Sequence, residues 1–312
     1  MISYLATAEH LYTIKMFLRH WAPELRPHFR LIPYESVESS IERGSTVQLP
    51  GGTYIFSDFD RLTVKQRSLA NLIAEAVEQH GYSVLNKPQS QLSRYELLRE
   101  LYRRGINRFN VYRGDERPER FPVFIRPIEE HKGFLSGVIH SQSALDDQLA
   151  ALMSGGKGET ELLICEFLDV SDASGIYRKF GSFLLGDRVV QCHEFFSSNW
   201  TTKLGVSSFT HEFGEEEWRV VSASGDPHEE RLKEAFEIAH VDYGRIDFGV
   251  LDGQVQIWEI NTNPTITGNP RGVRPERIRL KELVHKRLSD AFLLLNDPRS
   301  ETITLIPPQV CV

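Results

Sequence analysis

Apolar residues recur with two different periods along residues 1–90. Short apolar runs are typical of buried strands, and they occur at 2–6, 53–56 and 82–85. Between them, residues 9–21 and 68–79 carry apolar side chains three and four positions apart, as on one face of a helix. Strands that alternate with helices at this spacing predict a small parallel α/β lobe.

A second unit is expected at residues 91–160. Ser93 and Glu96 have the spacing of a capping box, which predicts a helix that ends at Gly105. A strand at 121–126, a glycine-containing loop at 127–137 and a helix at 143–153 follow.

A third unit is expected at residues 161–312, so the predicted class is mixed α/β (α+β). Its expected strands and helices are 162–167, 179–185, 188–193, 227–239, 246–250, 254–261 and 275–295. Gly186-Asp187 predicts a tight turn between two of these strands.

The hairpin at 246–261 allows two turns. A two-residue Asp252-Gly253 turn pairs Leu251 with Gln254 and sets Asp247 and Glu259 on opposite faces. A three-residue turn with a bulge at Gly253 pairs Val250 with Gln254 and sets the two acids on one face. We favour the three-residue turn, because it separates polar from apolar side chains.

In that register Asp247, Glu259 and Asn261 share one face, and Phe248, Val250, Trp258 and Ile260 share the other. Two close carboxylates repel each other unless a cation lies between them. Ligands made only of oxygen suit Mg²⁺, which completes its shell with phosphate and water. Arg245 shares their face and is a candidate to hold an anion. The alternative is a solvated strand face with an incidental pair of acids.

Charge and composition further limit the range of possible functions. The chain has 312 residues, and 36 basic against 43 acidic residues give a net charge of −7. General binding to nucleic acid or to an anionic membrane is therefore not expected. No apolar run approaches the roughly 18–20 residues of a membrane span. Three isolated cysteines and the absence of a signal-peptide pattern predict a reduced, cytoplasmic protein.

The hairpin sequence Arg245-Ile246-Asp247 and Trp258-Glu259-Ile260-Asn261-Thr262-Asn263-Pro264 resembles the metal-binding hairpin of the ATP-grasp superfamily of carboxylate–amine ligases. The resemblance extends over residues 85–295 and implies an ATP-grasp fold preceded by a small α/β lobe. It implies that Asp247, Glu259 and Asn261 hold two magnesium ions, with Mn²⁺ as a substitute, against the phosphates of ATP. Arg245 then contacts an acyl phosphate.

The resemblance also implies a set of nucleotide-binding residues. Arg94 and Arg126 stand where many members have lysine, and Lys132 lies in a loop similar to the flap over the phosphates. Glu166, Phe167 and Leu168 resemble the hinge that binds adenine, Asp169 and Asp172 are candidates for the ribose, and Lys179 is a further cation. Arg271 and Arg274 are candidates to clamp an acid substrate.

The implied reaction is ATP-dependent joining of a small carboxylic acid to an amine or another nucleophile. Two alternatives stay open: a small-molecule kinase on the same fold, and a nucleotide-binding regulatory module without turnover. The two arginines at lysine positions motivate the second alternative. The first lobe is also a candidate surface for a homodimer.

Overall fold

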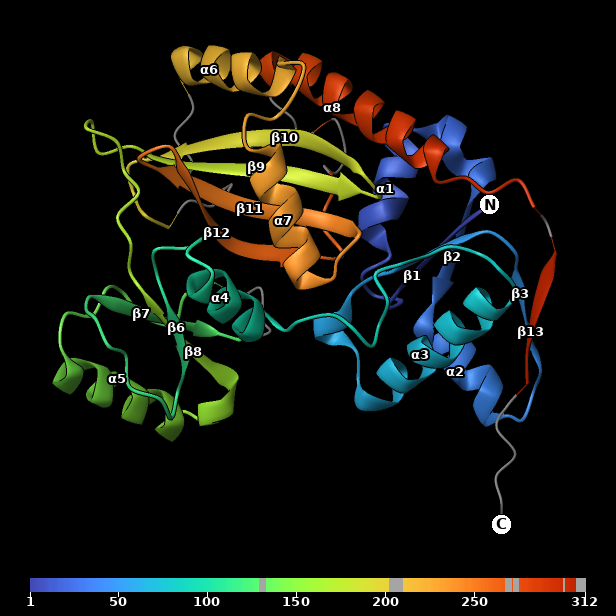
Figure 1. Ribbon diagram of the computed structural model, residues 1–312, viewed down its shortest axis with the longest axis horizontal. Coiled ribbons are helices and arrows are strands. Elements are labelled where there is room, and N and C mark those ends of the chain that lie inside the picture. The colour runs from blue at the N-terminus through green and yellow to red at the C-terminus, as the bar shows by residue number, and fades with distance from the viewer. Residues whose placement is uncertain (129–132, 202–209, 267–270, 272–274, 300, 307–312) are drawn as a thin grey trace.

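Four sets of paired strands organise the chain in the computed structural model (Figure 1). The structure describes residues 1–312 except 129–132, 202–209, 267–270, 272–274, 300 and 307–312. Helices and strands are interleaved, which confirms the mixed α/β class. No helix in the described part of the chain combines the length and the apolar character required to cross a bilayer.

The first lobe contains a four-stranded parallel sheet in the order β2-β1-β4-β5. Its strands are β1 (Ile2–Ala6), β2 (Phe29–Pro33), β4 (Thr53–Phe56) and β5 (Val84–Leu85). Its helices are α1 (Tyr12–His20), η1 (Pro23–His28), α2 (Tyr34–Glu42), η2 (Phe59–Arg61) and α3 (Val64–Gln79). The parallel lobe is therefore as predicted, whereas β2 and α2 had no prediction.

A short ribbon ties the end of the chain to this lobe. β13 (Thr302–Leu305) pairs antiparallel with β3 (Val47–Pro50), about 250 positions earlier in the sequence. Ile303 and Leu305 of β13 join the same apolar core as Leu49. Neither strand was predicted, because each pairs only with a distant segment.

The second sheet is small and antiparallel, in the order β6-β8-β7. It consists of β6 (Val111–Arg113), β7 (Val123–Pro127) and β8 (Leu162–Glu166), and α5 (Gln142–Ser154) and η3 (Glu159–Glu161) lie beside it. Leu145 of α5 packs against Ile125 and Ile164. The predicted boundary between the second and third units, at residues 160 and 161, therefore falls inside this sheet. It assigns β6 and β7 to the second unit and β8 to the third.

The helix α4 (Arg94–Arg103) begins at the predicted capping box, with both Ser93 and Glu96 making their reciprocal bonds. Its buried leucines contact both antiparallel sheets. Leu97, Leu98 and Leu101 share one core with Val111 and Leu163 of the small sheet and with Phe248 and Ile257 of the large sheet. This packing places the start of α4 beside the hairpin.

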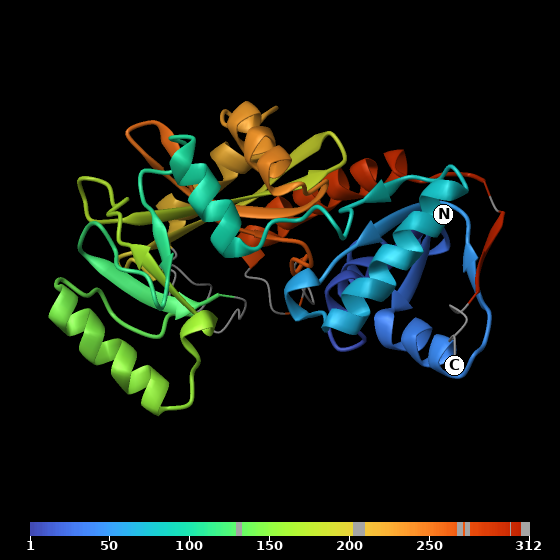
Figure 2. The ribbon, with the colours of Figure 1, turned by 60° about the horizontal axis from the view of Figure 1, so that its bottom comes forward.

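The large sheet has the order β10-β9-β11-β12. Its strands are β9 (Tyr177–Leu185), β10 (Arg188–Ser197), β11 (Tyr243–Leu251) and β12 (Gln254–Asn261). α7 (Glu229–Ala239) covers one face, and α6 (His211–Ser222) and α8 (Pro275–Leu294) lie along β10 (Figure 1). The turn at Gly186-Asp187 is confirmed, because Leu185 pairs with Arg188. α6 was not predicted. Figure 2 shows the large sheet between the first lobe and the small sheet.

The hairpin has the two-residue turn, so our preferred turn was wrong. Leu251 pairs with Gln254, and Asp252 and Gly253 both have positive φ, at 51° and 76°. The register then shifts by one residue between Phe248, opposite Ile257, and Asp247, opposite Glu259. This β-bulge makes Trp258 the extra residue. Asp247 and Glu259 therefore share a face as predicted, but the bulge and not the turn is the cause.

Candidate active site

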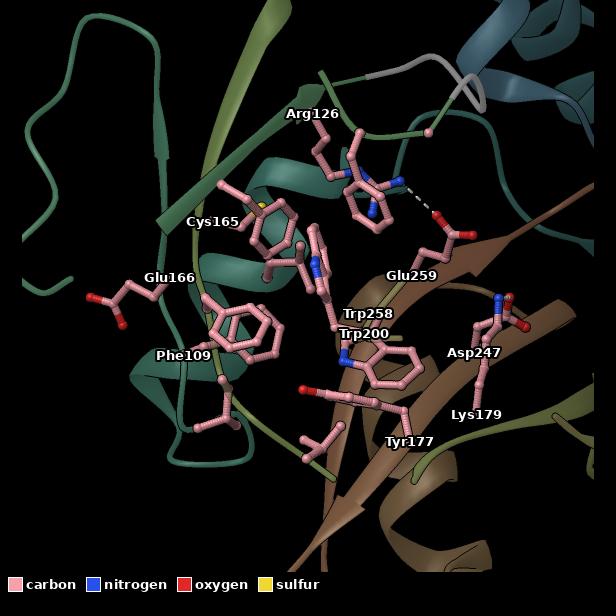
Figure 3. A pocket seen from close by; sticks show the side chains of 17 residues that line it. Phe109, Arg126, Cys165, Glu166, Tyr177, Lys179, Trp200, Asp247, Trp258 and Glu259 are labelled. Carbon is pink, nitrogen blue, oxygen red and sulfur yellow. Dashed lines mark hydrogen bonds and ion pairs between the residues drawn. The ribbon is translucent and has the colours of Figure 1, made fainter. Parts of the chain in front are cut away.

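A pocket lies between the small sheet and the large sheet (Figure 3). β11 and β12 contribute Asp247, Trp258 and Glu259 to its wall, and β9 contributes Tyr177 and Lys179. The small sheet and the segment after β8 form the opposite wall, which includes Arg126, Cys165, Glu166, Phe167 and Leu168. Much of the predicted site therefore meets in one place, from segments far apart in the sequence.

Asp247 is the buried acid of the site, with only 1% of its surface exposed. Lys179 Nζ lies 2.6 Å from its Oδ2, and Arg245 Nε donates to its Oδ1 at 2.8 Å. Burial alone would lower the pKa of Arg245, but the charge of Asp247 reverses this, and the net pKa shift is upward. Both cations come from the same sheet, so the large sheet by itself balances the charge of Asp247.

Glu259 is held from the other side of the pocket. Arg94 Nη2 and Arg126 Nη2 both donate to its Oε2, at 3.0 and 2.9 Å. Arg94 also donates to the carbonyl of Ile128. Burial, followed by the neighbouring charge of Arg126, lowers the pKa of Arg94. Two guanidinium groups at lysine positions of the resembled family thus converge on one carboxylate.

Asn261 lies opposite Arg245 and on the same face as the two acids. Its side-chain oxygen accepts a hydrogen bond from the backbone N–H of Asn263 at 3.0 Å. Asn263 is buried and accepts bonds from Tyr4 Oη and Thr13 Oγ1 in the first lobe. The segment after β12 is therefore fixed to the first lobe directly beside the candidate metal ligands.

The donor set suits a hard divalent cation with an incomplete protein shell. Asp247, Glu259 and Asn261 offer two carboxylates and one amide oxygen on one face. Among the described residues there is no group of three His, Cys, Asp or Glu that could hold a metal. A cation held by these three residues would complete its shell with phosphate and water, which is the coordination that Mg²⁺ prefers.

The hinge residues line the pocket, but the side chain of Glu166 turns away from it (Figure 3). Its carboxylate accepts bonds from Tyr112 Oη and the backbone N–H of Asn110, both at 2.9 Å, and pairs with Arg120. Glu166 is 5% exposed, so this carboxylate ties β6 to β8. Phe167 donates its backbone N–H to the carbonyl of Pro122 at 2.8 Å.

The two ribose candidates lie in the turn that follows the hinge. Asp169 accepts the backbone N–H of Ser171 at 2.9 Å, and this hydrogen bond lowers its pKa. Asp172 pairs with Arg178, which lowers the pKa of Asp172, and it also accepts bonds from the backbone of the turn. Both carboxylates therefore stabilise the turn, and a contact with ribose stays a prediction.

Three further candidates are not brought to the pocket by the described structure. Lys132 and Arg274 lie outside the described residues. Arg271 is described and exposed. The proposed clamp on an acid substrate by Arg271 and Arg274 therefore stays a prediction.

An aromatic cluster at the hinge end of the pocket was missed. Trp200 lies 4.5–5.6 Å, between ring centroids, from Phe124, Phe134 and Phe167. These four rings come from four separate segments, and aromatic residues at strand ends are as common in cores as in binding sites. Nothing in the local pattern could distinguish them.

Trp258 is a second correction. It lines the pocket with Asp247 and Glu259, whereas the expected register placed it on the opposite face. A Cβ on Gly249 would lie 2.7 Å from the Trp258 ring, so glycine leaves the space that this ring occupies. The bulge at Trp258 is the physical reason, because an extra residue interrupts the strict alternation of faces, so Trp258 and Glu259 both line the pocket.

Comparison with solved structures decides the fold. A D-alanine–D-alanine ligase from Bacillus anthracis complexed with ATP has a TM-score of 0.52 and 11% identity, over 95% of this chain and 96% of that chain. The ATP-grasp ligase PsnB complexed with its minimal precursor has a TM-score of 0.56 and 11% identity, over 94% of this chain and 99% of that chain. This chain has the ATP-grasp fold.

The ATP-grasp assignment rests on structure alone. No family model matches the sequence, and no curated protein matches it either. The resemblance inferred from the hairpin motif is thereby confirmed at the level of fold. At such low identity the ATP-grasp neighbours do not assign an activity or a substrate to this chain.

Proposed function

We propose that this ATP-grasp chain is an ATP- and Mg²⁺-dependent ligase that joins a carboxylic acid to an amine or another nucleophile. The pairing of Asp247 with Glu259 supports this most directly, since two acids share one face beside a pocket between two sheets. Cations from both walls surround them. Such a site suits a nucleoside triphosphate with its metal ion.

Asp247, Glu259 and Asn261 would hold the metal. Bound Mg²⁺ supplies charge neutralisation at the β- and γ-phosphates of ATP. We expect two ions, and Mn²⁺ as a working substitute. Arg94 and Arg126 would then donate their hydrogen bonds to phosphate oxygens in place of Glu259. Guanidinium groups bind carboxylate and phosphate in the same way.

In the proposed reaction a carboxylate oxygen of the acid attacks the γ-phosphorus of ATP, and the bond to the β–γ bridging oxygen breaks. The products are an acyl phosphate and ADP. An amine then attacks the acyl carbon, loses a proton and displaces phosphate. Arg245 is placed beside Asp247 to stabilise the negative charge that develops on the acyl group.

The aromatic end of the pocket is proposed to receive the adenine. Phe124, Phe167 and Trp200 offer ring faces next to the hinge backbone of Phe167 and Leu168. Stacking of a base on an aromatic ring contributes about 1–3 kcal/mol. Recognition at this end would therefore depend on stacking and on backbone hydrogen bonds.

The test is ADP formation from ATP and Mg²⁺ with panels of acids, amines and short peptides. Peptides are included because a solved structure of PsnB is of its complex with a precursor peptide. We expect ADP release that requires an acid and is lost in Asp247→Asn. Asp252→Asn is the matched control, because Asp252 lies in the turn of the same hairpin and pairs with Arg108 at the surface.

Three other outcomes would contradict the ligase. A stable phosphorylated product with no need for an amine would indicate a kinase. Tight ATP binding without turnover on any acid would indicate a regulatory module. Failure to bind ATP with Mg²⁺ would contradict the proposed nucleotide site itself. The cytoplasmic location and a homodimer stay predictions.

A further inference from the structure

One cross-strand row of the large sheet extends from the candidate metal ligands to β10. Glu259 lies opposite Asp247, Asp247 opposite Gly181, and Gly181 opposite His193. Directly opposite residues of antiparallel strands point to the same face. A Cβ on Gly181 would overlap the His193 ring, so the imidazole lies across Gly181 toward Asp247.

His193 is buried without a full set of partners. It is 4% exposed, and its Nε2 has no hydrogen-bond partner among the described residues. Its Nδ1 lies 3.2 Å from Cys192 Sγ. Burial, followed by the charges of Arg245, Lys281, Lys179 and Arg277, lowers its pKa, so the ring is neutral. A buried polar atom without a partner is rare in native proteins and needs an explanation, such as a ligand.

The helix α8 brings two cations to this row. The Arg277 guanidinium lies 5.3 Å from the Phe195 ring centroid, and Phe195 stacks on His193 at 4.2 Å. Lys281 follows one helical turn later and is 8% exposed. Burial, and then the charge of Arg277, lowers the pKa of Lys281 to about 8, so it remains mostly charged at neutral pH.

Positive charge exceeds negative charge around His193. The four cations that act on it are Lys179, Arg245, Arg277 and Lys281. Two carboxylates pair with members of this group, Asp247 with Lys179 and Arg245, and Glu217 with Arg277. Among the described residues, no carboxylate forms an ion pair with Lys281.

Neighbouring acids do not cancel this surplus. Glu194 alternates to the other face of β10 and lies 3.5 Å from Arg178, and burial raises its pKa to about 8. An anionic ligand would balance this positive charge.

We propose, building on the ligase function above, that Arg277 and Lys281 of α8 and His193 of β10 bind a second anionic group of the acid substrate. The carboxylate to be activated would lie at Arg245, beside Asp247. The second group, a carboxylate or a phosphate, would lie among Arg277, Lys281 and His193 Nε2. The preferred acid is thus a dianion.

The experiment compares acids that differ only in the second charge. The pairs are glutamate with glutamine, succinate with succinamate, and 3-phosphoglycerate with glycerate. KM for each acid comes from ADP release. Affinity is measured separately by calorimetry with Mg²⁺ and a non-hydrolysable ATP analogue. We expect at least a tenfold lower KM and Kd for the charged member of at least one pair, and the pair concerned distinguishes a carboxylate from a phosphate.

Lys281→Met removes the charge and keeps much of the side-chain volume. We expect it to reduce the preference for the charged member to less than threefold, with Lys281→Arg retaining most of the preference. Lys286→Met is the matched control, because Lys286 is exposed on the same helix and pairs with Asp290. Burial of a charge without a partner costs free energy, so we expect Lys281→Met to leave the fold stable, and the thermal midpoint of each variant checks this.

The outcomes separate the two proposals. ADP release with neutral and charged acids at equal KM would keep the ligase and overturn the dianion subsite. Calorimetric binding of the charged acids without ADP release on any acid would keep the subsite and contradict the ligase. A preference for charged acids that Lys281→Met leaves unchanged would also overturn the subsite, because its charge would then have another source.

Discussion

The two ends of the pocket use opposite kinds of side chain. At the hairpin end, Asp247 and Glu259 are each held by two cations. At the hinge end, Phe124, Phe134, Phe167 and Trp200 contact one another through their rings. Charge at one end and stacking at the other suit a molecule with a polyanionic tail and a flat aromatic head. The residues of the ionic end were predicted from their own pattern, whereas the hinge residues were predicted only from the family resemblance and the aromatic rings around Trp200 were missed.

The largest effect is expected from Glu259→Gln at the ionic end. The variant removes one of the two proposed carboxylate ligands and leaves Arg94 and Arg126 without their shared carboxylate. We expect ADP release to fall about 100-fold or more, which is a typical cost of losing one electrostatic group in an active site. Kinetics over a range of Mg²⁺ concentrations measure it. Activity within threefold of wild type would contradict the proposed role of Glu259 as a metal ligand.

Gly181→Ala tests how closely the ionic end is packed. The new methyl group would overlap the His193 ring, and that ring is buried and has little room to move. We expect the free energy of unfolding to fall by about 1–3 kcal/mol, as for other overpacked sites. Urea unfolding measures it. Gly225→Ala is the control, because nothing lies within 4 Å of a Cβ there. Equal stability of the two variants would contradict the position of His193.

Trp200→Ala tests the aromatic end. It removes the ring that contacts Phe124, Phe134 and Phe167 together. We expect Kd for ATP to rise about tenfold, because one base–aromatic stack contributes about 1–3 kcal/mol. Calorimetry with an ATP analogue measures it, and Trp200→Phe is expected to retain most of the affinity. If kcat fell and Kd stayed constant, the contrast between the two ends would be wrong.

The smallest effect concerns Glu194, on the face of β10 opposite His193. Burial raises its pKa from 4.5 to about 8, so the folded state binds its proton more tightly than the unfolded state. The resulting stabilisation is complete below pH 4.5 and is lost as the pH rises through 8. Glu194→Gln does not titrate. We expect it to gain about 1 kcal/mol over wild type between pH 7 and pH 8.5, by urea unfolding at both values. A constant difference would contradict the shifted pKa.

The ionic end was predictable because its signal is local. Asp and Asn are disfavoured inside strands, so their presence in a hairpin with alternating apolar residues indicated a site. The capping box of α4 was equally local, and it places Arg94 at the first turn of that helix. The family resemblance alone implied that Arg94 and Arg126 bind the nucleotide, and their convergence on Glu259 became apparent only in the structure.

The prediction from sequence was wrong where a single residue controls the register of the hairpin. Asp252-Gly253 forms the two-residue turn, and the bulge at Trp258 restores the shared face of Asp247 and Glu259. A bulge leaves little trace in the pattern of apolar residues, since Ile257 and Ile260 are apolar in either register. The face of Trp258 was therefore predicted wrongly, while the cluster of acids was predicted correctly.

The sequence by itself determined the parallel first lobe, the hairpin with the candidate metal ligands and the cations near it. The spacing of apolar residues, helix capping and charge are all properties of short segments. The tertiary structure decided the bulge, the aromatic end, the return of β13 to β3 and the position of His193 over Gly181. Each of these depends on contacts between residues that are distant in the chain. Local patterns carry no information about such contacts, because any apolar or aromatic segment can bury its surface against many others.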